Sequence, residues 1–388
     1  MAFQKFRADH LFDGYRLLDA DHVLITDPQG VVVEIVALAD AGDEIQQVSG
    51  ILSPGFINCH CHLELSHMKG LIAPGTGLVE FVSAVISQRH FPKEEILLAI
   101  EQAENEMLDN GIVAVGDICN NTLTLSQKKK GRMYYHNFIE ASGFSPAVAG
   151  QRFQHSLDFF NEFATQYSIP IESNSIVPHA PYSVSDELWE RIIHFPGNHL
   201  FTIHNQETRA EDELFRHGTG DFLNLYAQMG IDYSFFKPTG KSSFQSFLPK
   251  FLPNQSVVLV HNVYTTEDDI QYRRQKPFNS LLSWCLCPNA NLYISGELPA
   301  VDLMLKYDLP VVLGTDSLAS NHALSIISEM KTIRDHFPLV TTEQLFRWAT
   351  INGAKALQID HLLGSFEKGK KPGIVLSKED LSASKRIL

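Results

Sequence analysis

The chain has 388 residues, 44% of them hydrophobic, which is enough to bury the core of one large domain with an appendage or of two domains. Its net charge of −14 disfavours nucleic acid or an anionic membrane surface as a partner. The start of the chain has no signal-peptide core, no apolar stretch reaches the length of a membrane span, and the five cysteines show no disulfide framework. We therefore expect a soluble cytoplasmic protein.

Residues 1–55 contain short β-type runs. The runs at 23–25, 31–36 and 51–52 are separated by turn signals, of which Asp27-Pro28-Gln29-Gly30 is the clearest. This pattern predicts a small antiparallel sheet.

From Phe56 onward, single strands alternate with helical stretches. The clearest helix is expected at 92–111, where apolar residues recur at spacings of three and four and Asn110-Gly111 supplies the stop. Near-continuous apolar strands separated by helices indicate a parallel sheet that is buried on both faces, and eight of them indicate a (β/α)₈ barrel. The eight strands are predicted at 56–62, 112–115, 133–139, 175–177, 200–203, 256–260, 284–286 and 310–313.

Two further local expectations can be stated. The lysine run at 128–130, the one basic cluster of note, is typical of a solvated loop. A helix is expected at 322–334, with Ser320 or Asn321 as its cap.

The first predicted barrel strand ends in a His-x-His pair. Residues two apart on a strand point to the same face, so His60 and His62 point one way and Cys59 and Cys61 point the other. Two imidazoles on one face are half of a divalent-metal site, although this spacing alone is weak evidence. The same alternation argues against a zinc knuckle that uses both sulfur and imidazole.

Polar residues also close the other apolar runs, which suits a barrel with its active site at the carboxyl ends of the strands. Ordinary strand-to-loop transitions would explain polar residues in general, but they do not explain the succession of histidines followed by an aspartate. That ligand mix favours a catalytic metal site. The strand-end residues are His60, His62, Asp117, Asn137, Glu140, His179, His204, Glu207, His261, Asn289 and Asp316.

Several segments together resemble the amidohydrolase superfamily. The similarity is to the cytosine deaminase-like and chlorohydrolase-like branch with one catalytic metal, and in particular to nucleoside and aminofutalosine-type deaminases. The matching segments are PGFINCHCHLE at 54–64, PHAPYS at 178–183, HNQET at 204–208, LVHN at 259–262, LGTDS at 313–317 and ATINGA at 349–354.

The resemblance implies an α/β fold, a (β/α)₈ TIM-type barrel with a small β-sandwich domain built from both chain ends. The barrel would span 56–361, and the small domain would combine 1–55 with 362–388. Relatives usually carry Ala-Asp where this chain has Pro372-Gly373, a departure that concerns the small domain and not the metal site.

The resemblance also implies one divalent metal ion, for which Zn²⁺ is the first expectation and Fe²⁺ also suits the ligands. The ligands would be His60, His62, His204 and Asp316, with one position left open for water. The binuclear branch carries a carboxylated lysine at the end of strand four. Here that strand ends in His179 and contains no lysine, which favours a single metal.

By resemblance, three residues have catalytic roles. Glu207 would move a proton from water to a ring nitrogen of the substrate, His261 would orient or polarise the attacked group, and Asp316 would accept a proton from the water. Each of the first two has a structural alternative: Glu207 lies at an acidic helix start, where a carboxylate is favoured in any case, and His261 could be a buried, hydrogen-bonded histidine.

Two further residues are substrate-binding candidates by resemblance, His179 and Glu80. The register at Glu80 also allows a surface carboxylate at a helix start. The long segment between strands five and six could form a lid or a substrate wall, and its aromatic residues could stack on a heterocycle or pack the segment onto the barrel.

We therefore expect a hydrolytic deaminase that releases ammonia from an amino-substituted purine or a related heterocycle. Two alternatives remain open: hydrolysis of another C–N or a C–Cl bond on such a ring, and a catalytically silent barrel that serves as a binding scaffold. The expected partner is a small heterocyclic substrate, without nucleic acid or membrane, and a homodimer is one assembly open to the chain.

Overall fold

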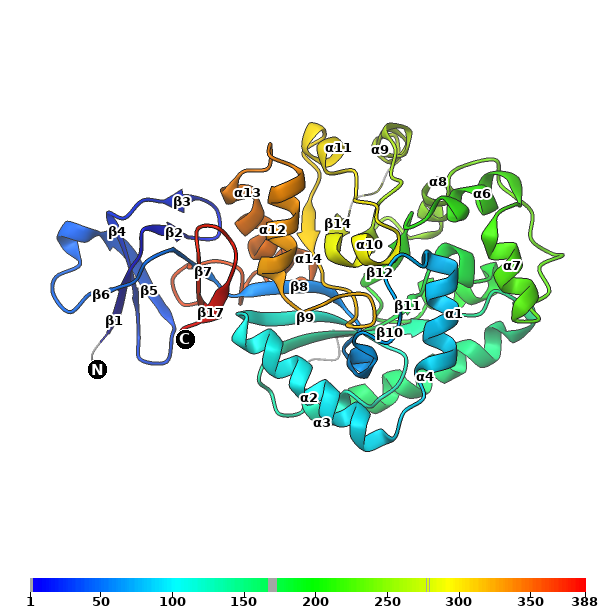
Figure 1. Cartoon of the computed structure of the whole chain (residues 1–388), viewed down its shortest axis with the longest axis horizontal. Helices are drawn as coiled ribbons and strands as arrows, with labels where there is room; N and C mark the ends of the chain where they lie inside the picture. Colours follow the sequence, from blue (N-terminus) through cyan, green and yellow to red (C-terminus); the bar gives the residue numbers. More distant parts are fainter. Residues whose placement is uncertain (1–2, 167–172, 277, 279) are drawn as a thin grey trace.

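The structure is a computed structural model that describes residues 3–166, 173–276, 278 and 280–388. A small β unit built from both ends of the chain lies beside a larger α/β body (Figure 1). Within the described part of the chain, no helix combines the length and apolarity that crossing a bilayer requires.

Eight parallel strands form the centre of the larger body, in two four-stranded sheets. All eight strands predicted from the sequence are confirmed, and every strand has hydrogen-bonded parallel neighbours. The first sheet contains β8 (Phe56–Cys61), β9 (Ile112–Cys119), β10 (Tyr134–Ala141) and β11 (Asn174–Pro178). The second contains β12 (Leu200–Asn205), β13 (Ser256–His261), β14 (Leu282–Leu286) and β15 (Val311–Leu313).

Backbone contacts join the two sheets near the carboxyl ends of their strands. The amide of His204 on β12 donates to the carbonyl of His179, just beyond β11, at 3.0 Å. On the other side, the amide of Thr315 donates to the carbonyl of His60 at 3.0 Å, and Cys61 and Asp316 form a parallel bridge. Strand ends that are distant in sequence therefore meet at one face, which points away from the small β unit (Figure 1).

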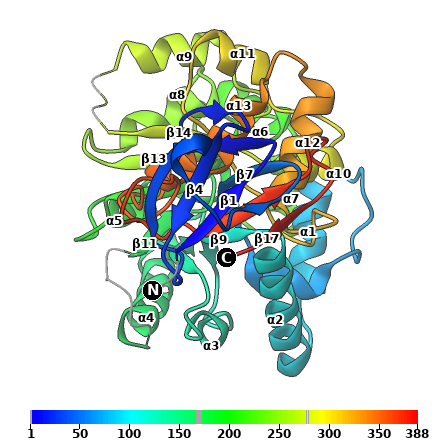
Figure 2. The same ribbon diagram turned by 90° about the vertical axis from the view of Figure 1, so that its left-hand side faces the viewer.

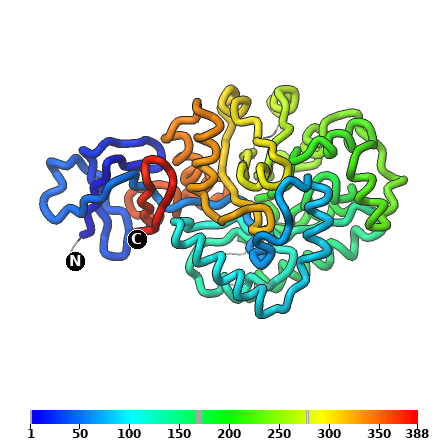
Figure 3. The backbone as a smooth tube through the Cα atoms, in the orientation of Figure 1, coloured from blue at the N-terminus to red at the C-terminus, as the bar shows by residue number. Residues whose placement is uncertain are grey.

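Helices cover the outside of this body, as the smooth tube of Figure 3 also shows. The expected helix at 92–111 is confirmed as α2 (Lys93–Asp109), with Ile96, Ile100 and Met107 buried against the sheet. The other long helices are α1 (Leu78–Gln88), α4 (Ala149–Gln166) and α12 (Ile326–His336). The shorter ones are α3 (Leu125–Lys128), α5 (Asp186–Ile193), α6 (Arg209–His217), α7 (Asp221–Gln228), α8 (Ser243–Phe247), α9 (Glu267–Arg274), α10 (Pro288–Ile294), α11 (Val301–Lys306), α13 (Thr342–Ala349) and α14 (Ile351–Ala356).

The small β unit faces the viewer in Figure 2. Its strands form two sheets in the orders β5-β4-β1-β6 and β17-β16-β7-β2-β3. The expected single antiparallel sheet is therefore wrong in two respects, because there are two sheets and both the β1–β6 and β2–β7 pairs are parallel. Its strands are β1 (Gln4–Arg7), β2 (His10–Phe12), β3 (Leu17–Leu18), β4 (His22–Thr26), β5 (Val32–Ala37), β6 (Gln46–Gln47), β7 (Ile51–Pro54), β16 (Ile374–Ser377) and β17 (Ser384–Arg386).

Two local expectations are wrong. Helix α12 begins at Ile326 and not at 322, and its N-cap position is Ser325 rather than Ser320 or Asn321. The side-chain oxygen of Asn321 does accept from the backbone amide of His322 at 2.7 Å, but its NH2 group also bonds Thr315 and Glu329, so Asn321 holds the loop that precedes the helix. The lysine run is not a fully solvated loop either, since Lys128 is completely buried while Lys129 and Lys130 are exposed.

Candidate metal centre and active site

The His-x-His pair lies at the end of β8 with both rings directed to one point. The Nε2 atoms of His60 and His62 are 3.2 Å apart. The Oδ1 atom of Asp316 lies 3.6 Å from the first nitrogen and 3.4 Å from the second. A ring nitrogen of His204, from β12, lies within 4.8 Å of ring nitrogens of both histidines. Three imidazoles and one carboxylate from distant parts of the sequence therefore converge.

This donor set fits a divalent metal ion. Two nitrogens bound to a tetrahedral zinc ion at about 2.0–2.1 Å would lie about 3.3 Å apart, close to the separation of the His60 and His62 nitrogens. Burial lowers the pKa of His62 and of His204, so both rings are neutral and offer lone pairs. Burial alone would raise the pKa of Asp316, but the nearby imidazoles of His60, His62 and His261 hold it below the usual range, which favours the carboxylate.

Neighbouring groups fix the orientation of these side chains. The Nδ1 atom of His204 donates to the backbone carbonyl of His179 at 2.7 Å, which leaves its Nε2 free as a ligand. The hydroxyl of Ser320 donates to Oδ2 of Asp316 at 2.6 Å, which leaves Oδ1 directed at the histidines. Asp316 itself has a φ of +57°, a conformation that costs energy for a non-glycine residue and is typical of functional sites.

A carboxyl and a further imidazole lie beside this cluster. The Oε2 atom of Glu207, just beyond β12, lies 3.6 Å from Nε2 of His261 at the end of β13. Burial raises the pKa of Glu207, and the charge of Asp316 raises it further, which favours the protonated acid. Burial lowers the pKa of His261 to about 3, so this ring is neutral. Its Nδ1 atom lies 3.1 Å from the side-chain nitrogen of Asn291.

A cavity of about 400 Å³ opens over these groups. Helix α7 supplies part of its wall through Leu225 and Tyr226, so the long segment between strands five and six does form a wall of the cavity. Phe235 and Phe236 of the same segment pack on Phe144 and do not line the cavity, which agrees with a packing role for them. The sequence-predicted residues that line the cavity are His62, His179, His204, Glu207, His261 and Asp316.

A model of the amidohydrolase family matches residues 51–386 of this chain. The chain belongs to this family. It is 25% identical to the adenosine deaminase of Helicobacter pylori over an alignment of 328 residues. This alignment covers 83% of this chain and 78% of the deaminase.

Two solved structures resemble this amidohydrolase in fold. The aminofutalosine deaminase of Helicobacter pylori, in complex with methylthio-coformycin, aligns with a TM-score of 0.80 and 21% identity, over 99% of this chain and 97% of the other. The zinc complex of the atrazine chlorohydrolase of Arthrobacter aurescens aligns with a TM-score of 0.73 and 16% identity, over 96% and 87%.

Glu80, a substrate-binding candidate by resemblance, lies outside the cavity. Helix α1 directs Leu78 and Phe81 inward, and both line the cavity. Glu80, between them, is exposed and does not line it. Helical geometry places Glu80 on the outer face, which agrees with the alternative of a surface carboxylate at a helix start.

Two carboxyl groups near the site were assigned no role from the sequence. Glu140, at the end of β10, has its Oε1 atom 3.7 Å from Nδ1 of His204, and Asn120 donates to its other oxygen at 2.8 Å. Glu64 accepts from the amide of Asn120 at 3.0 Å, and burial raises its pKa to about 8. Both residues could have been selected as candidates from the sequence, because Glu140 closes a predicted strand and Glu64 follows His62 by two residues.

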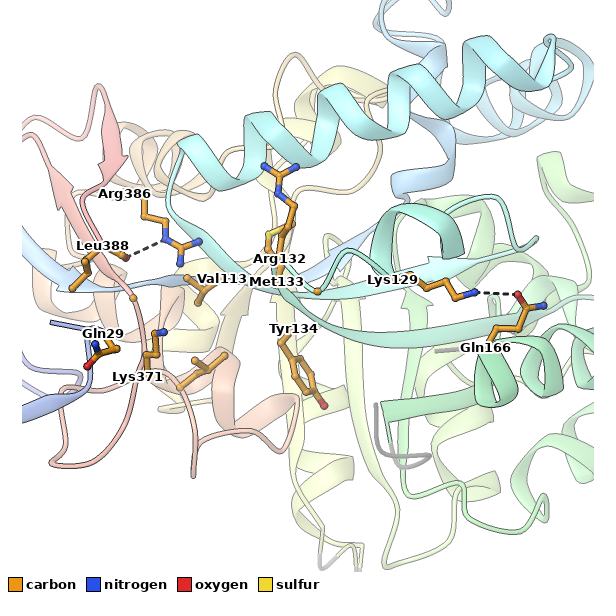
Figure 4. A pocket seen from close by; sticks show the side chains of 14 residues that line it. Gln29, Val113, Lys129, Arg132, Met133, Tyr134, Gln166, Lys371, Arg386 and Leu388 are labelled. Carbon is orange, nitrogen blue, oxygen red and sulfur yellow. Dashed lines mark hydrogen bonds between the residues drawn. The ribbon is translucent and has the colours of Figure 1, made fainter. Parts of the chain in front are cut away.

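A second cavity, of about 530 Å³, lies where the small β unit meets the beginnings of β9 and β10 (Figure 4). Its lining includes four cationic side chains, but Arg132 pairs with Glu104 at 3.2 Å and Lys129 donates to Gln166 at 3.4 Å. Histidine and carboxylate side chains are absent from the residues that line it, so it does not resemble the metal centre.

Proposed function

We propose that this amidohydrolase is a metal-dependent aminohydrolase that releases ammonia from an amino-substituted purine or a related heterocycle. The observation that carries the proposal is the convergence of His60, His62, His204 and Asp316 at one end of a cavity, with the buried acid Glu207 beside them. The curated relative named an adenosine deaminase supports the same reaction class.

We further propose that the two parallel sheets are one closed (β/α)₈ barrel at 56–361, with a β-sandwich domain made of 1–55 and 362–388. The hydrogen bonds that join β12 to the end of β11, and the residues after β15 to β8, support closure on both sides. The pairing of β16 with β7 supports a small domain that combines both chain ends.

His60, His62, His204 and Asp316 would hold a single divalent ion, for which we propose Zn²⁺ before Fe²⁺. When bound there, the ion would supply Lewis-acid activation of a water molecule. The neutral state of the His62 and His204 imidazoles and the ionised state of Asp316 support this assignment.

The chain's own residues would then move the protons. Asp316 would take up the proton that leaves the attacking water and pass it to the amino group, so that the carbon–nitrogen bond breaks and ammonia leaves. Glu207, protonated in its buried position, would donate a proton to a ring nitrogen and so make the neighbouring carbon electrophilic. The second proton of that water would return to Glu207 as the carbonyl forms. Neutral His261 would contact the attacked group. His179 uses Nδ1 on the hydroxyl of Ser183 at 2.7 Å, which leaves its other nitrogen for the substrate.

The experiment is ammonia release by metal-replete protein across a panel of aminated purines, pterins and pyrimidines, with the metal-stripped protein as the control. Release from at least one ring, lost on stripping and restored by the metal, is expected. Release of chloride from a chlorinated ring without any ammonia release would favour the C–Cl alternative, which the fold neighbour named a chlorohydrolase raises. No turnover of any ring would support a silent scaffold.

A further inference from the structure

A fully buried lysine, Lys128, contacts polar side chains of strands β9 and β10. The side chain of Lys128 is 0% exposed, and its Nζ atom lies 2.5 Å from Oδ2 of Asp117. It also donates to Oδ1 of Asn137 at 2.7 Å and to Sγ of Cys119 at 3.3 Å. The three N–H groups of the ammonium thus have three acceptors. Burial alone would lower the pKa of Lys128, but Asp117 and Cys119 hold it above its ordinary value, so it stays charged.

The other oxygen of Asp117 bonds the backbone directly after His62, one of the proposed metal ligands. Oδ1 of Asp117 accepts from the backbone amide of Leu63 at 2.9 Å, and Leu63 directly follows His62. The chain leaves β8 at this point and enters the 3₁₀ segment Leu63–Met68. Asp117 also pairs in register with Cys61, between the two histidines. The carboxylate therefore holds the backbone on which His60 and His62 are mounted.

We propose that Lys128 and Asp117 form a positioning pair that fixes the carboxyl end of β8, with Lys128 holding the Asp117 carboxylate in the orientation that anchors the backbone after His62. This inference rests on the proposed function, because it assigns the pair to the metal centre. A buried ion pair is itself weak evidence for stability, since an apolar pair of similar volume is often as stable. This pair differs from an ordinary buried ion pair because Asp117 accepts a hydrogen bond from the amide of Leu63, the residue that follows the proposed ligand His62.

The test compares metal affinity in two double variants. Lys128→Met/Asp117→Asn removes both buried charges but keeps an oxygen for the amide of Leu63. Lys128→Met/Asp117→Val removes the acceptor as well. Neither leaves an unpaired buried charge, which the single Lys128→Met variant would do. Zn²⁺ affinity, measured by competition with a chelator, is expected to fall about tenfold in the first and up to about 100-fold in the second, as for other changes in groups that orient metal ligands.

Lys130→Met is the matched control. Lys130 pairs with Glu101 at 2.7 Å on the surface, two residues along the chain from Lys128, so its loss is expected to leave Zn²⁺ affinity unchanged. Double variants that bind Zn²⁺ as tightly as the parent, whatever happens to their unfolding temperature, would overturn the inference and leave a merely structural pair. A parent that binds neither Zn²⁺ nor Fe²⁺ would instead refute the proposed function.

Amide hydrogen exchange of the parent gives a second readout that does not depend on the folding of any variant. If the pair anchors the strand end, the Leu63 amide is protected both with and without metal. Rapid exchange of this amide in the metal-free protein would contradict the inference.

Discussion

The carboxyl group of Glu207 lies 3.6 Å from Nε2 of His261, and both side chains are buried at the edge of the imidazole cluster. The two come from neighbouring strands, and the ring of His261 stacks on that of His204 with centroids 5.6 Å apart. An acid and a neutral imidazole thus share one wall of the cavity.

The first prediction concerns this acid. Glu207→Gln removes the transferable proton while keeping the shape of the side chain, so kcat for ammonia release is expected to fall about 10²–10⁴-fold. Metal content should stay at the parent level. Glu213→Gln, an exposed glutamate on the same helix α6, is the control and should keep the parent rate. A Glu207→Gln variant as fast as the parent would remove Glu207 from the mechanism.

The second prediction concerns removal of the metal. Because the ion binds the folded chain, the parent should lose thermal stability on chelation and regain it with Zn²⁺, by about 2.7 kcal/mol at a free concentration 100 times Kd. His62→Ala should abolish this response. His194→Ala, which changes an exposed histidine paired with Glu190, should leave it intact. Differential scanning calorimetry measures the change in thermal stability on adding Zn²⁺. A change as large in His62→Ala as in the parent would argue against the assigned ligands.

The third prediction concerns pH. Burial raises the pKa of Glu211 from 4.5 to about 8, and its Oε1 atom accepts from the amide of Gln206 while its Oε2 atom has no partner in the described chain. The folded state therefore favours the proton. The stabilisation from this proton is complete below pH 4.5 and is lost as the pH rises to about 8. A pKa shift of this size corresponds to roughly 5 kcal/mol at most.

Glu211→Gln tests this by removing the titration. Its free energy of unfolding, from urea titrations at pH 5 to 9, should fall less with increasing pH than that of the parent. Parallel pH profiles for the two proteins would contradict the expected pKa.

The fourth prediction concerns the packing of β9 against β8. A Cβ atom at Gly116 would lie 2.6 Å from the backbone carbonyl oxygen of Cys59, next to His60. Gly116→Ala should therefore destabilise the fold by about 1–3 kcal/mol. Gly150→Ala, in helix α4 with only the tip of Arg191 nearby at 3.9 Å, should be neutral or stabilising by up to about 1 kcal/mol. Equal urea midpoints for the two variants would show that the strands tolerate the extra methyl group.

Strand positions were predictable from the sequence because a strand buried on both faces is a continuous apolar run. The ends of the strands were less predictable. Strand β9 continues to Cys119, past Asp117, because the backbone ladder to β10 continues through the polar residue. In contrast, strand alternation alone predicted that the His60 and His62 rings point the same way. The distance of 3.2 Å between their Nε2 atoms confirms this prediction.

The errors arose where long-range partners decide the outcome. Lys128 belongs to a run of three lysines, and its acceptors Asp117 and Asn137 lie on two strands, so no local pattern indicates its burial. Asn321 has the chemistry of a helix cap, and its oxygen does accept from the amide of His322, but its NH2 group ties the loop to Glu329 and the helix begins only after Ser325. Glu80 could be placed outside the cavity only once the buried face of α1 was known.

The most direct measurement is a metal-site determination on protein purified with Zn²⁺: elemental analysis for the number of ions per chain, with anomalous X-ray diffraction to place them. One ion per chain is expected, bound by nitrogens of His60, His62 and His204 and by an oxygen of Asp316. An ion bound elsewhere, or a zinc-replete crystal in which these four side chains hold nothing, would contradict it.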